Sequence, residues 1–125
     1  MAVQCSDAYD EGNIFARILR GEIPSARVYE DEAVIAFRDI HPVAPVHVLV
    51  IPRAAYVGLS DFAAAASDAE LAGFLRGVGA AARALGLEGE GYRVLINAGP
   101  HGGQEVPHLH AHILGGRPLG PMLAP

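Results

Sequence analysis

The sequence has a single cysteine, no lysine and no long apolar run, and each scarcity excludes a class of protein. Because Cys5 has no partner within the chain, a small secreted domain held together by internal disulfides is excluded. No uninterrupted apolar run approaches the roughly 20 residues that a membrane helix needs, so we expect no membrane-spanning segment. Nine arginines stand against 14 acidic residues, and the net charge of -5 disfavours binding to a nucleic-acid backbone.

The length of 125 residues and the 51% hydrophobic share predict one domain with a single core. The start of the chain, from Met1 to Asp7, lacks the cationic and apolar regions of a secretion signal, so we expect a cytoplasmic protein. Residues 1–12 are polar and aperiodic and are expected to form a flexible arm. Residues 13–116 are expected to form the domain, and residues 117–125 a tail interrupted by proline and glycine.

The hydrophobic periodicity predicts a mixture of helices and strands. Asn13 is a typical helix cap, and apolar residues at helical spacing from Ile14 to Leu19 predict a short first helix that ends near Gly21. Ser60 to Phe62 indicate a further short helix start. Runs of β-prone residues predict five strands, of which the first two form a hairpin, at 27–29, 34–37, 46–51, 92–96 and 108–114.

A long helix is expected after the capping box of Ser67 and Glu70, and Gly86 is expected to end it. Its predicted apolar face recurs at helical spacing and consists of Leu71, Phe74, Leu75, Val78, Ala82 and Leu85. Three glycines weaken this helix, so we expect it to depend on packing against the sheet. The predicted fold class is α+β, a five-stranded, mostly antiparallel sheet with one long and one short helix.

Three histidines alternate with apolar residues in the last predicted strand, at His108, His110 and His112. Because alternate residues of a strand project to the same side, we expect the three imidazoles on one face and the apolar residues on the other, against the helix. Each imidazole must find a hydrogen-bond partner or stay in water, which is costly in a purely structural sheet. The pattern therefore indicates a functional site.

Two other interpretations of the histidines stay open at this point. One or two of them could bind backbone carbonyls in a structural role, or all three could occupy corners of a zinc tetrahedron. The glycine-rich turn 97–104 favours a phosphate ligand instead, because glycines let backbone N–H groups approach an anion closely. An imidazole can attack phosphorus, and neighbouring imidazoles can transfer the leaving-group proton, so the two features together indicate nucleophilic phosphorus chemistry.

The run from Gly103 to Gly116, GQEVPHLHAHILGG, resembles the signature of the histidine-triad (HIT) family. The similarity covers nearly the whole chain, including 13–25, 36–42 and 47–52. Gly115, Gly116 and Arg117 resemble the nucleotide-binding phosphoramidase branch rather than the dinucleoside polyphosphate hydrolases. The resemblance implies a homodimer in which two five-stranded sheets join into one ten-stranded sheet.

The resemblance also implies roles for individual residues. His110 is expected to be the nucleophile that forms a nucleotidyl-histidine intermediate, His112 to contact phosphate and assist the leaving group, and His108 and His47 to orient that centre. Asp39 is expected to bind both ribose hydroxyls, which a carboxylate can accept as a pair. The expected phosphate contacts are made by Asn97 and by the backbone of Gly103, Gln104 and Val106. The expected purine slot consists of residues that would otherwise be ordinary core, namely Ile14, Phe15, Ile18, Phe37 and Ile40.

The chain also departs from some members of this family. Certain relatives hold zinc through a Cys-x-x-Cys motif, but Asn13 and Ala16 occupy those positions, so we expect no metal. Glu105 replaces a serine that contacts phosphate in animal members, so only backbone contact is expected nearby. The tail also lacks the tryptophan or histidine of animal members, which leaves the substrate preference open.

The expected function is hydrolysis of purine nucleoside phosphoramidates or acyl-adenylates to AMP or GMP and an amine or acid, with no cofactor. Two alternatives remain. The same histidines would serve a dinucleoside polyphosphate hydrolase, or the protein would be a nucleotide-binding regulatory module with incidental catalysis.

Overall fold

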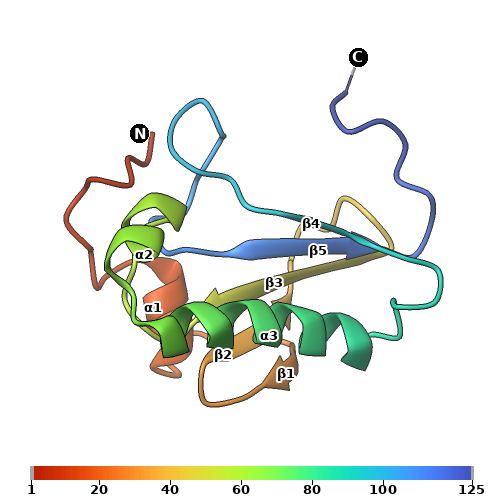
Figure 1. Ribbon diagram of the computed structural model, residues 1–125, viewed down its shortest axis with the longest axis horizontal. Coiled ribbons are helices and arrows are strands. Elements are labelled where there is room, and N and C mark those ends of the chain that lie inside the picture. The colour runs from red at the N-terminus through yellow and green to blue at the C-terminus, as the bar shows by residue number, and fades with distance from the viewer. Residues whose placement is uncertain (1, 125) are drawn as a thin grey trace.

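The computed structural model describes residues 2–124 and contains one mixed α+β unit (Figure 1). Its elements, in chain order, are α1 (Ile14–Leu19), β1 (Arg27–Glu30), β2 (Val34–Arg38), β3 (Val46–Pro52), α2 (Leu59–Ala65), α3 (Asp68–Ala84), β4 (Arg93–Leu95) and β5 (Ala111–Gly115). The five strands form one antiparallel sheet in the order β1-β2-β3-β5-β4. The predicted fold class and the predicted hairpin are therefore confirmed.

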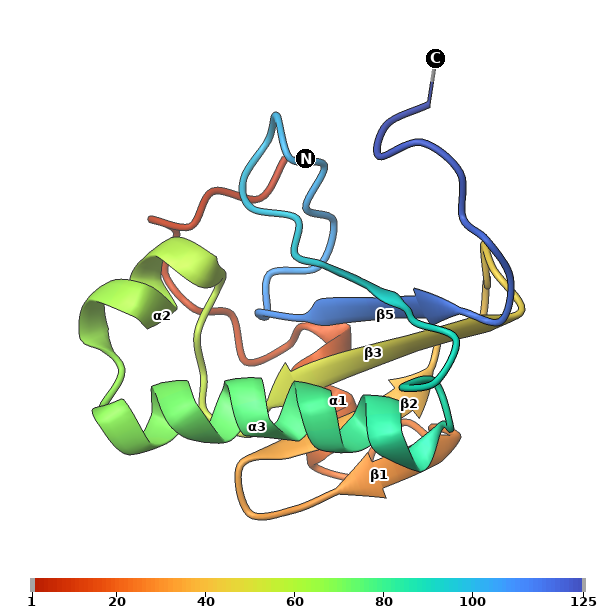
Figure 2. The same cartoon turned by 45° about the vertical axis from the view of Figure 1, so that its right-hand side comes forward.

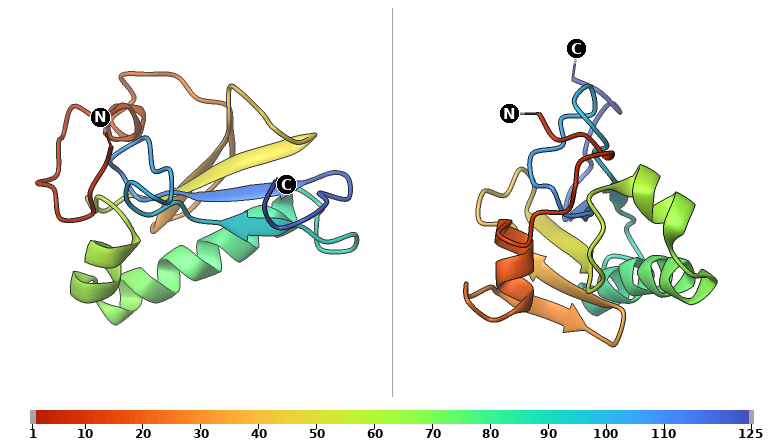
Figure 3. Two further views of the ribbon diagram at one scale, coloured as in Figure 1. Left: turned by 90° about the horizontal axis from the view of Figure 1, so that it is seen from above. Right: turned by 90° about the vertical axis from the view of Figure 1, so that its left-hand side faces the viewer.

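The sheet is covered on both faces, by α3 on one side and by the shorter α1 on the other (Figures 2 and 3). Alternate residues of β2 divide between these two layers. Val34 and Ala36 pack with the α3 side, whereas Ile35 and Phe37 pack with Phe15 of α1. β3 divides in the same way, so the two central strands are buried on both faces. The layer under α1 is the one that holds the site.

The short first helix begins where the sequence predicts it. The side-chain oxygen of Asn13 accepts hydrogen bonds from the backbone N–H groups of Phe15 and Ala16, at 3.0 and 2.9 Å. At the other end Gly21 has a φ of 78°, which favours glycine. Capping at both ends sets the position of this six-residue helix, and the burial of Phe15 and Ile18 holds it to the sheet.

The long helix begins at the predicted capping box of Ser67 and Glu70. One part of its predicted apolar face is wrong, because the side chain of Leu75 is 73% exposed. Leu75 is one residue beyond Phe74, about 100° further around the helix, and this places it past the edge of the buried stripe. That stripe consists of Phe74, Gly77, Val78, Ala81 and Ala82.

Gly77 belongs to the buried stripe because α3 lies very close to the sheet at this position. A Cβ atom on Gly77 would lie 2.5 Å from Cγ2 of Val34. The glycine that lowers helix propensity therefore permits the close packing of α3 on β2. The expectation that α3 depends on packing against the sheet has this specific basis.

The last two strands are shorter than predicted. β5 begins at Ala111, paired with Val50, so His108 and His110 precede the regular ladder. β3 ends at Pro52, which has no N–H to donate. The N–H of Leu109 instead donates to the carbonyl of Tyr56 at 2.9 Å. Likewise β4 spans only Arg93–Leu95. Within residues 2–124, no helix combines the length and apolarity that crossing a bilayer would require.

We predict opposite effects for two glycine substitutions in α3. Gly77→Ala forces a methyl group against Val34, and we expect the free energy of unfolding to fall by about 1–3 kcal/mol. Gly79→Ala meets no atom within 4 Å, and we expect it to raise the free energy of unfolding by about 0.5–1 kcal/mol through helix propensity. Urea denaturation of both variants measures the difference. Equal stabilisation by the two alanines would contradict the close approach of α3 to the sheet.

Candidate functional site

Four histidines gather on the face of the sheet that α1 covers. His108, His110 and His47 are buried, and His112 is partly buried. The ring centroid of His112 lies 5.2 Å from that of His110 and 5.2 Å from that of His47. The intervening residues, Leu109, Ala111 and Ile113, belong to the core cluster on the α3 side. The alternation read from the sequence therefore holds even where the regular strand has not yet begun.

Backbone carbonyls fix the protons of the first two triad histidines. Nε2 of His108 lies 2.9 Å from the carbonyl oxygen of Pro52, and Nδ1 of His110 lies 2.7 Å from the carbonyl oxygen of His108. Because a carbonyl only accepts, each of these ring nitrogens carries a proton. The lone pair of neutral His110 is therefore on Nε2, the nitrogen that remains available to a ligand.

The other two histidines form a relay that starts at a backbone N–H. The N–H of Val43 donates to Nδ1 of His47 at 3.2 Å, so the proton of neutral His47 is on Nε2. Nε2 of His47 lies 2.9 Å from Nδ1 of His112, which accepts that proton's hydrogen bond. The proton of His112 is then on its own Nε2. Among the buried side-chain nitrogen and oxygen atoms of residues 2–124, that Nε2 is the one without a hydrogen-bond partner.

All four imidazoles are held in their neutral form. Burial lowers the pKa of His108 to about 4. Burial, together with the repulsion that a protonated His110 or His47 would exert, lowers the pKa of His112 to about 4. Burial also lowers the pKa of His110 and of His47, although the Asp39 carboxylate opposes the shift at His47. At neutral pH the cluster thus offers one lone pair, on His110, and one unpartnered N–H, on His112.

An apolar cavity of about 580 Å³ lies beside this cluster. Phe15 connects the two, because it lines the cavity and packs edge-on against His110 with ring centroids 5.0 Å apart. Asp39 also lines the cavity, and its Oδ2 lies 3.4 Å from Nε2 of His47. The structure brings all five residues of the expected purine slot into this lining: Ile14, Phe15, Ile18, Phe37 and Ile40. Ile40 is 82% exposed, which is unusual for a core side chain and suits the rim of a pocket.

Of the residues in and after the glycine-rich turn that were expected to contact phosphate, one lines the cavity and three are hydrogen-bonded within the turn. Val106 lines the cavity. The N–H groups of Gly103 and Gln104 donate to the carbonyls of Pro100 and Gly99, both at 3.1 Å. These two N–H groups are already used within the turn, and phosphate contact through them would require the turn to open. The amide of Asn97 donates to the carbonyl of Gly102 at 2.7 Å, so in this structure it braces the turn.

The sequence reasoning missed two kinds of site residue. Leu49 and Ile23 line the cavity. Leu49 lies between His47 and Ile51 at alternate positions of β3, and that period of two was the signal that could have found it. Tyr9, in the segment expected to be a flexible arm, places its hydroxyl 2.6 Å from Nδ1 of His108. No periodicity could have found Tyr9, because the contact spans 99 residues of sequence.

A group of possible metal ligands exists within the site, but it is not the triad itself. One ligand atom each from Asp39, His47 and His112 lie within 4.8 Å of one another. Nε2 of His108 and Nδ1 of His110 cannot join them, because each of these nitrogens carries a proton that is hydrogen-bonded to a backbone carbonyl. Any metal would therefore compete with the hydrogen bond between His47 and His112.

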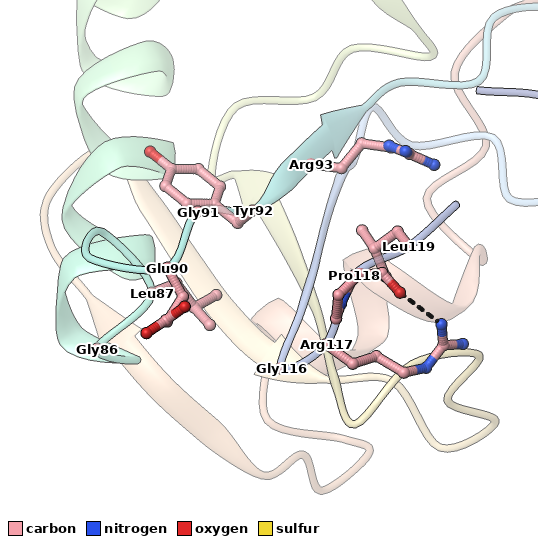
Figure 4. A pocket seen from close by; sticks show the side chains of 10 residues that line it. All are labelled: Gly86, Leu87, Glu90, Gly91, Tyr92, Arg93, Gly116, Arg117, Pro118 and Leu119. Carbon is pink, nitrogen blue, oxygen red and sulfur yellow. Dashed lines mark hydrogen bonds between the residues drawn. The ribbon is translucent and has the colours of Figure 1, made fainter. Parts of the chain in front are cut away.

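A second cavity, of about 630 Å³, lies between the loop after α3 and the tail (Figure 4). Arg93 and Arg117 line it, together with Tyr92 and Leu119. The guanidinium groups of the two arginines donate to backbone carbonyls of the tail, Arg93 to Gly120 and Arg117 to Pro118. None of the predicted site residues lines this cavity, so the cavity beside the histidines is the candidate functional site.

Comparison with known proteins gives the family of this chain. The model of the HIT domain family matches residues 20–119. The chain belongs to the HIT domain family. It is 48% identical over 114 residues to the purine nucleoside phosphoramidase of Escherichia coli K12, covering 91% of this chain and 95% of that one. It is also 50% identical over 112 residues to a 14 kDa zinc-binding protein of Zea mays, covering 88% and 86% of the two chains.

The fold agrees with solved structures of this family. The structure of a histidine triad protein from Clostridium difficile superposes with a TM-score of 0.81 at 41% identity, covering 93% of this chain and all of that one. The family resemblance read from residues 103–116 is thereby confirmed.

We predict that nitrogen NMR will show the proton arrangement derived above. At pH 7, His110 should carry its proton on Nδ1, whereas His47, His108 and His112 should carry theirs on Nε2. On acidification, His108 and His112 should remain neutral until the pH approaches their pKa of about 4. A proton on Nε2 of neutral His110 would contradict the assignment, because its lone pair would then face the carbonyl of His108.

Proposed function

We propose that this HIT domain protein hydrolyses purine nucleoside phosphoramidates or acyl-adenylates through a covalent intermediate on His110. The observation that carries the proposal is the proton arrangement of two adjacent rings. His110 has a lone pair on Nε2, and His112 has an unpartnered Nε2–H, beside a cavity with apolar walls. A nucleophile next to a free hydrogen-bond donor suits attack on phosphorus and stabilisation of the charge that develops on its oxygens. The name of the Escherichia coli relative points to the same substrate class.

The reaction proceeds in two displacements. Nε2 of His110 attacks phosphorus, the P–N bond of the phosphoramidate breaks, and the departing nitrogen takes a proton from the solvent to leave as the amine, while the Nε2–H of neutral His112 donates a hydrogen bond to a phosphoryl oxygen. A carboxylate leaving from an acyl-adenylate needs no proton. Water then attacks phosphorus, the bond to Nε2 of His110 breaks and restores its lone pair, and the water gives up a proton to the solvent. Each displacement is easier than the single direct one, and His108 and His47 keep the two rings oriented throughout.

The cavity supplies recognition of the nucleoside. The purine lies between Phe15, Phe37 and Ile18, with Ile14 and Ile40 at the rim, and covering these side chains removes apolar surface from water. Asp39 accepts hydrogen bonds from the two ribose hydroxyls, one to each carboxylate oxygen. The backbone of Val106 approaches the phosphate. The backbone N–H groups of Gly103 and Gln104 reach the phosphate once the turn opens, and the side chain of Asn97, which is bound to that turn, moves with it.

Binding of a metal is a second candidate function, because Asp39, His47 and His112 could provide three ligands and one relative is named a zinc-binding protein. This candidate and hydrolysis are separable, since the proposed reaction uses no metal. Chelator-treated protein that retains full turnover and contains no zinc by elemental analysis would dispose of the metal as a requirement.

The proposed assembly is a homodimer joined through β4. β4 lies at the edge of the sheet, and its Val94 is 42% exposed. An uncovered edge strand offers unpaired N–H and C=O groups to a second copy, which would extend the five strands to ten. The exposed apolar side chain on the short β4 supports this edge as the contact.

We predict that His110→Ala abolishes hydrolysis but retains nucleotide binding. Turnover of adenosine phosphoramidate should fall roughly 10⁴-fold or more, because the nucleophile is lost. AMP binding, measured by calorimetry, should remain detectable, because the apolar cavity is unchanged. His41→Ala is the matched control, since His41 is exposed, and its turnover should equal that of the unaltered protein.

Two measurements distinguish this mechanism from its rivals. Mass spectrometry of rapidly quenched protein should find the nucleotidyl group on His110, and an adduct on another residue would refute the assignment. Faster hydrolysis of diadenosine polyphosphates than of adenosine phosphoramidate would favour the dinucleoside polyphosphate hydrolase. Tight AMP binding with negligible turnover of either substrate would favour the regulatory module.

We predict that the protein sediments with about twice the 13.1 kDa mass of one chain. Val94→Asp should yield monomers, because a carboxylate on the edge strand would lose its hydration at the contact. Leu59→Asp is the control, since Leu59 is 40% exposed but lies on α2. Loss of the dimer in both variants, or in neither, would place the contact elsewhere.

A further inference from the structure

Tyr9 reaches the triad from the opposite end of the chain. The N-terminal segment runs beside the segment that leads into β5, as Figures 2 and 3 show. There the hydroxyl of Tyr9 lies 2.6 Å from Nδ1 of His108, with the two rings edge-to-face and their centroids 5.7 Å apart. Tyr9 itself is only partly buried, whereas His108 has no exposed surface. The phenol of Tyr9 therefore lies between the His108 ring and the solvent.

The direction of this hydrogen bond follows from the chemistry of the ring. Nε2 of His108 carries the proton, because it is bound to the Pro52 carbonyl, so Nδ1 has a lone pair and can only accept. Tyr9 must then donate its O–H. Burial raises the pKa of the Tyr9 phenol above its ordinary value, so that proton is retained across the physiological range. Without Tyr9, a fully buried lone pair would lose its donor.

The position of His108 matters to the nucleophile because the two share a hydrogen bond. The carbonyl of His108 accepts from Nδ1–H of His110 at 2.7 Å, and that bond places the lone pair of His110 on Nε2. Phe15 packs edge-on against both rings, with centroids 5.0 Å from His110 and 6.4 Å from His108. A displacement of the His108 ring is thus passed to His110 through the backbone and through Phe15.

We propose that Tyr9 is a positioning residue of the active site, whose O–H holds His108 so that the His108 carbonyl orients the nucleophile His110. The inference rests on the proposed function for its effect on turnover, but not for its effect on the rings. The N-terminal segment then belongs to the active site. Its connection to α1 is short and anchored, since the N–H of Asn13 donates to the carbonyl of Asp10 at 3.1 Å.

Tyr9→Phe tests this assignment, because it removes the hydroxyl and keeps the ring. We expect kcat for adenosine phosphoramidate to fall about tenfold, with KM and AMP affinity within twofold of the unaltered protein. In nitrogen NMR, the Nδ1 resonance of His108 should move to the position of an unprotonated imidazole nitrogen that receives no hydrogen bond. The His110 resonances should shift as well. A role confined to stability would move neither the resonances of His110 nor kcat at a temperature where both proteins are folded.

Tyr29→Phe is the matched control. The Tyr29 hydroxyl donates to Asp31 at 2.7 Å on β1, outside the site, so its loss should leave kcat and the histidine resonances unchanged. Unchanged His108 and His110 resonances in Tyr9→Phe would overturn the proposal, as would an unchanged kcat. If the unaltered protein failed to hydrolyse phosphoramidates, the proposed function would fall, and the resonances would still decide the positioning role. If Tyr9→Phe did not fold, the Nδ1 resonance of His108 in the unaltered protein would be the test. A resonance without the shift that a hydrogen bond causes would overturn the proposal.

Discussion

The chemistry of this site depends on where backbone groups place four protons. Imidazole has two nitrogens and, when neutral, one proton, so a buried ring is useful only if its tautomer is fixed. The carbonyls of Pro52 and His108 and the N–H of Val43 fix three rings, and the fourth, His112, follows from its contact with His47. These backbone groups belong to the sheet and its loops. The fold therefore determines which ring nitrogens carry lone pairs and which carry protons.

Burial supports this arrangement in a second way. Removing the rings from water disfavours their charged forms, and this lowers the pKa of all four histidines. A protonated His110 would have no lone pair, so low exposure keeps the proposed nucleophile competent at neutral pH. Burial is also what makes an unpartnered Nε2–H on His112 costly, and a phosphoryl oxygen is the kind of acceptor that would relieve that cost.

One segment, β5 with the residues that lead into it, serves both the core and the site. Along residues 108–113, the histidines face α1 while Leu109, Ala111 and Ile113 fill the core under α3. The close approach of α3 at Gly77 compacts that core. Local rules predicted the helix caps at Asn13 and Ser67, because capping involves neighbouring residues. They failed at Leu75, which lies past the edge of the helix stripe that the sheet buries, and at the start of β5, where pairing with β3 decides where the ladder begins.

The sequence by itself determined the α+β class, the alternation of histidines and apolar residues near the end of the chain, the family and five apolar residues of the cavity lining. The class and the alternation follow from local periods, the family follows from a contiguous motif, and the five cavity residues follow from the resemblance to that family. Only the tertiary structure decided which ring nitrogens carry protons, that Asn97, Gly103 and Gln104 are engaged within their own turn, and that Tyr9 contacts His108. The physical reason is that a hydrogen bond depends on a few tenths of an ångström between groups far apart in the chain, and such distances exist only after the sheet has formed.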